Sequence, residues 1–249
     1  MDSVILARGG SVSIPQKNSR NLGGKSLTSW TSQFAHSHPL INKVILSTDS
    51  SIVVRKDIVF CEFLESFKNL KVDKSVQVTD RLYLHKRNVK FADNKAKSAD
   101  AVINCVESLN LGLEDNSIPI LLLQPTSPFR RFHELFEIYD LFNNFKVPIF
   151  SAHELDSLHP LKVFQLDSSG GLHQDTDLKA LETARQILPK FYAPDGAYYL
   201  TTFEILKRHR TFILNSSKVY IREKNLSINI DNLVDLKIAR KNLKRFNFY

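Results

Sequence analysis

The sequence predicts an α/β fold of three layers, in which helices cover both faces of a mostly parallel sheet. Short β-rich segments alternate with segments of helical apolar spacing along the 249 residues, the pattern typical of such sheets. The segment at residues 118–123 is continuously apolar, as expected for a strand that is buried on both faces. The chain is long enough to bury a large core, and no repeat or linker divides it. We therefore expect a single domain over residues 1–249.

The first third of the chain predicts a strand, a helix and a second strand. Residues 4–7 form an apolar run that ends at a glycine-containing loop, residues 27–36 have helical apolar spacing, and residues 44–47 are again β-rich. The stretch that follows carries aromatic and charged side chains without a clear period. Within it, the sequence favours a helix near residues 59–67 and a strand near residues 76–82.

The middle of the chain alternates regularly. Apolar side chains recur at helical spacing over residues 96–109, which predicts a helix. The central strand at residues 118–123 comes next, then a helix over residues 132–142 and a strand over residues 147–152. These elements extend the βαβ pattern of a parallel sheet.

Residues 153–195 depart from this alternation. They contain several polar stretches and a Gly-Gly pair at residues 170–171 that is typical of a hairpin turn. In a sheet-based domain, such a segment is either a peripheral flap or an arm that reaches a neighbouring subunit. After it, the sequence predicts strands at residues 198–202 and 218–221 and a C-terminal helix at residues 233–246.

Composition limits the compartment and the partners. No segment has the pattern of a secretory leader or could span a bilayer, and two cysteines, Cys61 and Cys105, are too few for a disulfide scaffold or a zinc site. We expect both in the core, in a cytoplasmic protein without a membrane partner. The net charge of +8 admits an anionic ligand. Since no nucleic-acid-binding motif accompanies the charge, we expect no nucleic-acid partner.

The loop after the first predicted strand is the first candidate for a phosphate site. It carries Arg8-Gly9-Gly10-Ser11, followed by Lys17 and Asn18. Glycines let the backbone approach a phosphate so that its N–H groups point at the oxygens, and arginine and lysine supply charge. The spacing is neither that of a P-loop nor that of a dinucleotide fingerprint. The alternative is an ordinary connecting loop whose basic residues face solvent.

Two further segments could bind ligand. Gln124 follows the central strand, where ligands bind in open α/β sheets, and it could contact a base or a sugar; alternatively, it hydrogen-bonds the local backbone of a loop fixed by prolines. Asn229 and Asp231 alternate along a predicted short strand and so share a face, which could hold Mg²⁺. Asp231 could equally cap the helix that begins near residue 233.

Seven segments together resemble one family, the acylneuraminate cytidylyltransferases, also called CMP-sialic acid synthetases. The resemblance rests on residues 7–18, 47–49, 122–130, 159–162, 185–189, 194–199 and 228–231, read respectively as ARGGSVSIPQKN, STD, LLQPTSPFR, HPLK, RQILP, PDGAYY and INID. The segments fall in family order over nearly the whole chain. The resemblance implies a nucleotide-diphospho-sugar transferase fold, related to the Rossmann type, in which residues 153–195 form a protruding dimerisation arm.

The resemblance also implies a reaction. The expected activity joins CTP to a nine-carbon keto-acid sugar, with Mg²⁺ as cofactor, in a homodimer, and releases pyrophosphate. Arg8, Lys17 and Asp231 would be catalytic, and Asp231 and Asn229 would hold the metal. The nucleotide would contact Arg8, Gly9, Ser11, Lys17, Asn18, Arg87 and Ser98. The sugar would contact Gln124, Lys162, Arg185, Tyr199 and Phe212, with Lys162 and Arg185 reaching it across the dimer interface.

The chain departs from the family pattern in three places. Val12 and Ser13 replace Lys-Gly in the first motif, Asn229 replaces an aspartate, and Ala193 replaces an arginine. Losing a cation that contacts developing negative charge can cost about 3 kcal/mol in the barrier. The sequence therefore leaves two interpretations, an active synthetase and a catalytically impaired homologue that binds nucleotide or sugar without turnover.

Overall fold

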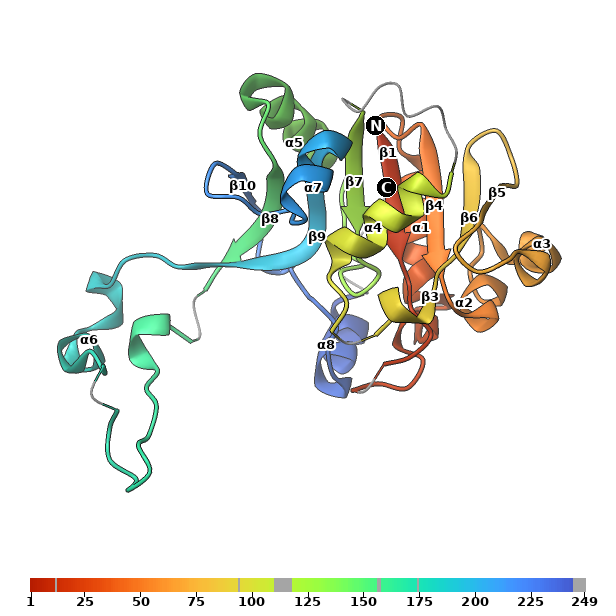
Figure 1. The fold of residues 1–249 in the computed structure, drawn as a ribbon. Helices are drawn as coiled ribbons and strands as arrows, with labels where there is room; N and C mark the ends of the chain where they lie inside the picture. Colours follow the sequence, from red (N-terminus) through yellow and green to blue (C-terminus); the bar gives the residue numbers. More distant parts are fainter. Residues whose placement is uncertain (12, 94, 110–117, 156–157, 174, 244–249) are drawn as a thin grey trace.

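The protein is organised around one large mixed sheet (Figure 1). The structure, a computed structural model, describes residues 1–11, 13–93, 95–109, 118–155, 158–173 and 175–243. Eight described strands form the sheet in the order β10-β8-β9-β7-β1-β4-β6-β5. Their bounds are β1 Asp2–Leu6, β4 Lys43–Thr48, β5 Ser75–Gln77, β6 Leu82–Lys86, β7 Pro119–Leu123, β8 Ile149–Glu154, β9 Tyr192–Thr202 and β10 Lys218–Ile221.

The sheet is mostly parallel, as the sequence predicts. β1 pairs in parallel with β4 and β7, β4 with β6, and β10 with β8. Two strands run the other way: β5 pairs antiparallel with β6, and β9 lies antiparallel between β7 and β8. A separate two-stranded ribbon joins β2 (Asn21–Leu22) to β3 (Lys25–Ser26).

Helices cover both faces of the sheet, which confirms the predicted three layers (Figure 1). Because successive side chains of a strand point to opposite faces, Val4 and Ile5 of β1 enter different cores. The core on the side of Ile5 contains side chains from α1, α2, α3 and α5, and the core on the side of Val4 contains side chains from α4 and α7. The helices are α1 Leu27–Ser37, α2 Ser51–Arg55, α3 Leu64–Asn69, α4 Ser98–Glu107, α5 Phe132–Phe145, α6 Leu178–Glu182, α7 Phe203–His209 and α8 Leu233–Leu243.

A third apolar cluster joins the last helix to the start of the chain. Leu236 and Ala239 of α8 pack with Ile14, Leu22 and Trp30, all of them buried. The cluster places α8 beside the loop that follows β1, although more than 200 residues separate them in sequence. Residues 244–246, the end of the predicted C-terminal helix, lie outside the described residues.

The poorly patterned stretch after β4 differs from the sequence prediction. The strand expected near residues 76–82 is wrong, because a turn interrupts it: the N–H of Val78 donates to the carbonyl of Leu82 (2.9 Å), which separates β5 from β6. The helix expected near residues 59–67 is a 3-10 turn, η2 (Cys61–Phe63), followed by α3, and α2 was not predicted. Each of these helices is six residues long or shorter, which is too short for a helical period to be recognised in the sequence.

The two cysteines have different surroundings. Cys105 lies on the buried face of α4, as expected, but Cys61 is exposed, which corrects the prediction that both lie in the core. Cys61 begins a turn whose preceding residue, Phe60, is fully buried. Since neighbouring residues of a turn point in different directions, Phe60 fills the core and Cys61 faces outward.

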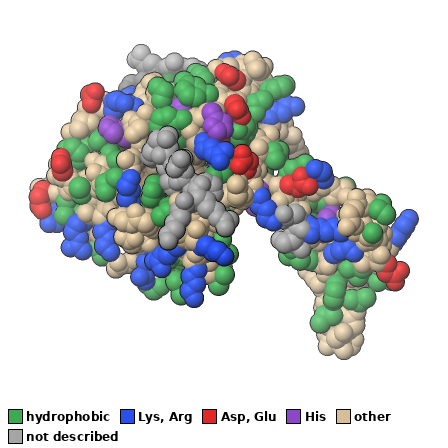
Figure 2. Space-filling model, turned by 180° about the vertical axis from the view of Figure 1, so that it is seen from behind, with side chains coloured by type: hydrophobic (Ala, Val, Ile, Leu, Met, Phe, Trp, Pro, Cys, Tyr) green, Lys and Arg blue, Asp and Glu red, His purple; other side chains and the backbone are tan. Residues whose placement is uncertain are grey.

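Residues 153–195 extend from the sheet between β8 and β9 as a protruding arm (Figure 1). The arm holds two 3-10 turns, η4 (Pro160–Lys162) and η5 (Arg185–Ile187), the helix α6, and a hairpin closed by a bridge between Leu166 and Leu172. Gly170 has a φ of 84° in the hairpin turn, which agrees with the prediction from the Gly-Gly pair. Figure 2 shows apolar side chains on the surface of the arm. None of the described helices is both long enough and apolar enough to cross a membrane.

Candidate active site

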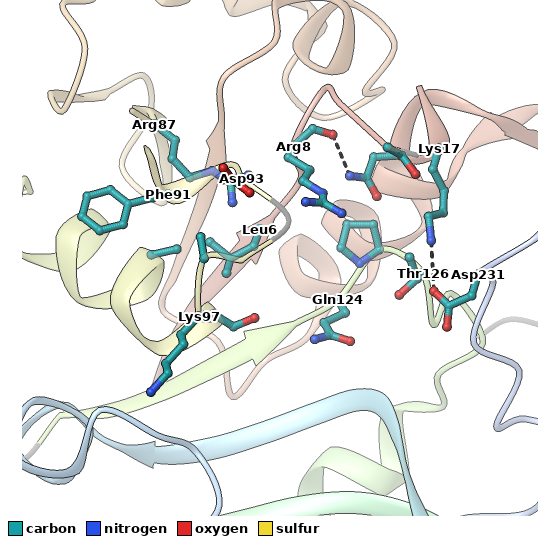
Figure 3. Close-up of a pocket in the computed structure, with 16 residues that line it drawn as sticks. Leu6, Arg8, Lys17, Arg87, Phe91, Asp93, Lys97, Gln124, Thr126 and Asp231 are labelled. Carbon is teal, nitrogen blue, oxygen red and sulfur yellow. Dashed lines mark hydrogen bonds and ion pairs between the residues drawn. The ribbon is translucent and has the colours of Figure 1, made fainter. Parts of the chain in front are cut away.

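A polar cavity of about 260 Å³ opens where the strands of the parallel part of the sheet end (Figure 3). Four segments that are distant in sequence line it: the loop after β1, the loop after β6 together with the start of α4 that follows it, the loop after β7, and the residues just before α8. The candidate residues that the cavity brings together are Arg8, Ser11, Lys17, Asn18, Arg87, Ser98, Gln124 and Asp231. Most of the predicted nucleotide residues and one of the two predicted metal ligands therefore line one cavity, whereas Gly9 and Asn229 are not among its lining residues.

Gly9 shapes the loop after β1 but points its amide elsewhere. A Cβ atom at Gly9 would lie 2.6 Å from the Cβ of Ser50, so only glycine fits against the loop after β4. The N–H of Gly9 donates to the Asp49 Oδ1 atom at 2.7 Å. This amide does not point into the cavity, contrary to the expectation from the sequence, and the glycine serves close packing of two loops.

Arg8 and Asn18 fix the shape of the same loop. Asn18 is 7% exposed and its Nδ2 donates to the Arg8 carbonyl at 2.9 Å, so its amide closes the loop rather than facing a ligand freely. The Arg8 Nη1 atom reaches the Ala92 carbonyl at 3.4 Å and its guanidinium lies inside the cavity (Figure 3). Val12, a position at which the chain differs from the family pattern, lies outside the described residues.

Arg87 supplies a second, deeper guanidinium. Only 5% of the residue is exposed, and burial lowers its pKa to about 10, against the opposing influence of the Asp49 carboxylate. Arg87 therefore keeps its charge at neutral pH. Its Nη2 atom donates to the Ser47 carbonyl at 3.0 Å, whereas its Nε atom has no hydrogen-bond partner among the described residues. A buried cation with a free donor on the cavity wall suits an anionic ligand.

Ser98 lies at the first turn of α4, and that helix begins at the cavity wall. The N-terminal end of a helix carries partial positive charge and unpaired N–H groups. Lys97, the residue before the helix, lines the cavity as well (Figure 3). The start of α4 thus adds to the positive potential that Arg8, Lys17 and Arg87 create.

Asp231, from the C-terminal part of the chain, faces these cations. Its Oδ1 atom lies 3.0 Å from the Lys17 Nζ atom, and its Oδ2 atom accepts from the Asn229 Nδ2 atom at 2.8 Å. Asp231 does not cap α8. Asn232 does, because its Oδ1 atom accepts from the amides of Val234 and Asp235 at 2.8 and 3.0 Å. The alternative reading of Asp231 as a helix cap is therefore wrong.

The predicted strand around Asn229 and Asp231 is also wrong. Residues 227–231 have no regular secondary structure, and among the described residues one backbone hydrogen bond ties them to the loop after β7, from the Ile230 N–H to the Thr126 carbonyl at 2.8 Å. Without a ladder of such bonds, no strand forms among these described residues. Asn229 and Asp231 still lie together, as their contact shows. Buried Ile230 between them anchors the segment in the third apolar cluster.

The donor set around Asp231 fits Mg²⁺. The Asn229 Oδ1 atom is buried and has no hydrogen-bond partner among the described residues, and the Asp231 side chain is 64% exposed. Mg²⁺ commonly takes one or two carboxylates and completes its shell with waters and substrate phosphates. No group of three or more His, Cys, Asp or Glu side chains in the described chain could hold a metal. The site thus suits an ion that shares its ligands with a phosphate-bearing substrate.

The sugar candidates do not all share this cavity. Gln124 lines it. Tyr199 and Phe212 contact each other, with ring centroids 5.9 Å apart, but they pack in the apolar layer beneath α4 and α7. Burial raises the pKa of Tyr199 to about 12, so its hydroxyl stays neutral. The two aromatic residues are part of the core beside the cavity rather than among its lining residues.

Lys162 and Arg185 lie in the arm, away from the cavity of their own chain (Figure 1). The Lys162 Nζ atom donates to the Leu181 carbonyl at 3.0 Å, and the Arg185 Nη2 atom donates to the Leu155 carbonyl at 3.2 Å. Both cations therefore hold the arm together in the isolated chain. This placement does not bring either side chain to a sugar in the cavity of the same chain.

A buried ionic network around Arg222, which the sequence does not predict, lies behind the Gln124 turn. Arg222 has a fully buried side chain, and its Nη1 atom lies 2.7 Å from the Asp195 Oδ2 atom while its Nε atom lies 2.9 Å from the Glu134 Oε1 atom. Burial alone would raise the pKa of Asp195, but the Arg222 charge and hydrogen bonds from Ser151 and Ala197 leave it lowered. Arg222 lies in no motif, so only the fold reveals the network.

A second buried arginine links this network to the cavity. The Arg130 guanidinium donates to the carbonyls of Gln124 (2.8 Å) and Ala197 (3.1 Å), and Arg130 is 3% exposed. It therefore fixes the turn that presents Gln124. The motif over residues 122–130 contained the signal, since it ends on this arginine, but the sequence does not show that its side chain turns inward.

Comparison with known proteins agrees with the geometry. The sequence model of the cytidylyltransferase family matches residues 3–238. A pseudaminic acid cytidylyltransferase of Campylobacter jejuni is 26% identical over 241 residues, 95% of this chain and 93% of the relative. A CMP-N,N'-diacetyllegionaminic acid synthase of Legionella pneumophila is 25% identical over 245 residues, 96% of this chain and 94% of the relative.

A solved structure shows the same fold. The CMP:2-keto-3-deoxy-manno-octonic acid synthetase, in complex with CTP, superposes with a TM-score of 0.60 and 12% identity, covering 98% of each chain. The expectation of a nucleotide-diphospho-sugar transferase type of fold is thus confirmed. Because the family match spans nearly the whole described chain, this protein belongs to the cytidylyltransferase family of nucleotidyltransferases.

Proposed function

We propose that this protein joins CTP to a nonulosonic (sialic-type) keto-acid sugar and gives the CMP-sugar and pyrophosphate. One observation carries the proposal: Arg8, Lys17 and Arg87, from distant parts of the chain, converge on one cavity with the carboxylate of Asp231. Three cations suit a triphosphate, and a carboxylate beside them suits its metal. The relatives named for pseudaminic and legionaminic acids support the sugar class.

The chemistry is attack of the anomeric hydroxyl of the sugar on the α-phosphorus of CTP. The new bond joins the anomeric oxygen to the α-phosphorus, the bond to the bridging oxygen of the β-phosphate breaks, and pyrophosphate leaves while the hydroxyl loses its proton. Such a reaction needs alignment and charge neutralisation rather than a covalent enzyme intermediate. Arg8 and Lys17 would bind the phosphates, and Arg87, Ser11 and Ser98 would hold the nucleotide.

Asp231 and Asn229 would hold the Mg²⁺ ion, which neutralises triphosphate charge when it is bound. Lys17 contacts the Asp231 carboxylate at 3.0 Å, so a phosphate oxygen bound to Lys17 would lie close to the proposed metal.

The sugar would contact Gln124 from the same chain and Lys162 and Arg185 from a second chain. Because these two cations lie in the protruding arm, they could reach a cavity only in another subunit. A guanidinium such as Arg185 can bind the carboxylate of an acidic sugar with two parallel hydrogen bonds. The proposed unit is therefore a homodimer that exchanges arms, located in the cytoplasm, where free cysteines such as Cys61 and Cys105 persist.

The alternative is a homologue that binds nucleotide or sugar without turnover. Asn229 gives the metal one charge less than an aspartate would, and Ala193, opposite His153 at the base of the arm, supplies no cation. The two proposals share the fold and the cavity but differ in whether pyrophosphate is released.

Pyrophosphate release separates the proposals. Purified protein is mixed with CTP, Mg²⁺ and, in turn, pseudaminic, N,N'-diacetyllegionaminic, N-acetylneuraminic and 3-deoxy-octulosonic acids, with each sugar omitted as the control. Release with one sugar supports the synthetase and names its substrate. Silence with all four, from protein that binds CTP in calorimetry, supports the inactive homologue. Absence of both CTP binding and sugar binding contradicts both proposals.

A further inference from the structure

A second polar cavity lies beside the loop of the candidate active site and shares no lining residue with it. The cavity measures about 360 Å³, within the range of small-molecule sites. Three structures meet there: the β2–β3 ribbon with the turn before it, the residue after α2, and the last turns of α8. Its lining residues are Ser19, Arg20, Asn21, Gly24, Ser26, Lys56 and Arg240.

The cavity wall is cationic and carries no carboxylate. Arg20, Lys56 and Arg240 are exposed, and none of them forms an ion pair with a described residue. The Arg20 Nε atom donates to the Pro15 carbonyl at 3.0 Å, and the Arg240 Nη2 atom donates to the Asn21 carbonyl at 3.2 Å. A guanidinium has five N–H donors, so each retains donors for a ligand.

The neighbouring carboxylate of Asp57 does not neutralise these cations. Asp57 is fully buried, and both of its Oδ atoms lie 2.8 Å from the Ser32 Oγ atom, on the inner side of α1. Its charge is turned away from the cavity that Lys56 lines.

Ser19 provides an independent sign of a ligand. The residue lines the cavity, is 6% exposed, and has an Oγ atom without a hydrogen-bond partner in the described chain. A buried hydroxyl without a hydrogen-bond partner is unfavourable, because it has lost its contact with water and gained none in return. An oxygen-rich ligand in the cavity would supply the missing partner.

We propose that this cavity binds a phosphoryl-containing anion, whether inorganic phosphate, pyrophosphate or the phosphate of a nucleotide. Guanidinium groups match the geometry of phosphate oxygens, and the cavity offers two of them with an ammonium group. The bound anion links Arg240 of α8 to Arg20. Since Arg20 directly follows η1 (Lys17–Ser19) and α8 follows Asp231, the anion braces both sides of the Lys17–Asp231 contact.

A site-resolved titration tests the proposal. Inorganic phosphate is added to ¹⁵N-labelled protein at constant ionic strength, and the amide signals of Ser19 and Gly24 are followed by NMR. We expect saturable shifts, weakened about tenfold in Kd by Arg240→Gln, because one charge-assisted contact is lost. Lys241→Gln is the matched control: it removes the same charge from the next residue of α8, which does not line the cavity.

Pyrophosphate and CMP, titrated in the same way, distinguish the sources of the phosphoryl group, and the tightest binder identifies the natural class. Lys56→Gln repeats the test without touching α8, in case Arg240→Gln lowers the stability of that helix. The proposal is overturned if all three ligands shift only residues around Arg8 and Lys17. It is equally overturned if Arg240→Gln and Lys241→Gln weaken binding alike, which would indicate an adventitious ion only.

Discussion

At the scale of single residues, Asp231 is the position on which the candidate site depends most directly. It contacts Lys17, the cation of the loop after β1, and Asn229, whose Oδ1 atom is unpartnered among the described residues. Since Asn232 caps the following helix, the fold does not need the Asp231 carboxylate. Function and folding are therefore separable at this residue.

We predict that Asp231→Ala lowers kcat about 100-fold or more, since it removes the charged ligand of the proposed metal, an effect on the scale of other lost charge contacts at reacting centres. Pyrophosphate release across a series of Mg²⁺ concentrations measures it, with the best sugar from the panel. Asp140→Ala is the control, an exposed aspartate of α5 that does not line the cavity. Wild-type activity and Mg²⁺ dependence in Asp231→Ala would remove this residue from the metal site.

At the scale of elements, buried carboxylates connect neighbouring segments in two ways, one with a partner cation and one without. Glu134 of α5 and Asp195 of β9 share the Arg222 guanidinium, so their charges are paired. Asp57, between α2 and η2, forms no ion pair with a described residue. Its carboxylate accepts hydrogen bonds from the Ser32 hydroxyl of α1 and the Val59 amide. The carboxylates paired with Arg222 and the unpaired carboxylate of Asp57 therefore have opposite effects on the free energy of unfolding.

We predict that Arg222→Met lowers the free energy of unfolding by about 3–5 kcal/mol, because it leaves two buried carboxylates without their cation. Urea denaturation measures the loss. Arg131→Met breaks a solvent-exposed pair with Glu223, 3.0 Å in length, and as the control should cost about 1 kcal/mol or less. Equal losses in the two variants would contradict the role assigned to the buried network.

Asp57 gives a prediction with the opposite sign. Burial raises its pKa to about 6 from the ordinary 3.8, so between pH 4 and 6 the folded state holds a proton that the unfolded state has lost. Stability attributable to this group therefore falls as pH rises through that window. We predict that Asp57→Asn is more stable than the wild type at pH 8, by up to about 3 kcal/mol, and that the gain disappears near pH 4.

Urea denaturation of both proteins from pH 4 to pH 8 checks the Asp57 prediction. The difference between the two proteins isolates this residue from other titrating carboxylates. Ser32 and the Val59 amide can still hydrogen-bond the asparagine oxygen, so the packing of α1 should persist. A difference that does not change with pH would show that Asp57 is ionised at all these pH values.

At the scale of the whole molecule, the arm is the feature that an isolated chain does not explain. Residues 153–195 project from the sheet (Figure 1), and large apolar side chains among the described residues of this arm are exposed (Figure 2). The most exposed of these in the arm are Leu158, Leu166, Leu178 and Ile187, at 64, 62, 59 and 76%. Apolar surface of this kind is typical of contact with another chain. The proposed homodimer gives the arm a partner and brings Arg185 to a second cavity.

We predict that Arg185→Ala raises the KM for the sugar at least tenfold and changes the KM for CTP little, because only the sugar carries the carboxylate that Arg185 would bind. Steady-state kinetics with each substrate varied in turn measures both values. Equal increases for sugar and CTP would remove Arg185 from the sugar site.

Mixing the two impaired variants, at a sugar concentration far below the KM of Arg185→Ala, tests the shared site separately. If Arg185 acts across the interface, refolding Arg185→Ala with Asp231→Ala forms mixed dimers that contain one intact site, and activity returns to about a quarter of the wild-type value for random pairing. No recovery in mixtures that sediment as dimers would show that each chain uses its own Arg185. A wild-type protein that sediments as a monomer would contradict the exchange of arms.

The fold class and most of the longer strands and helices could be predicted from the sequence, because hydrophobic periodicity reports burial along one element. The loop after β1 and Gln124 could be expected at one edge of the sheet, because the loops after parallel strands meet there. Arg87 and Asp231 were grouped with them only on the resemblance to the cytidylyltransferase family. Short elements such as α2 and β5 escaped, since a few residues carry too little periodicity.

Tertiary structure alone decided which side chains meet. Only the folded chain shows that Asn232 rather than Asp231 caps α8, and that the Gly9 amide turns to Asp49. It also pairs Arg222 with Glu134 and Asp195, which are 88 and 27 residues away in sequence. The Ser19 Oγ atom, beside three cations, has no hydrogen-bond partner among the described residues. A hydrogen bond or ion pair depends on distances between atoms of remote segments, and these distances are fixed by packing in three dimensions, which a local sequence pattern does not encode.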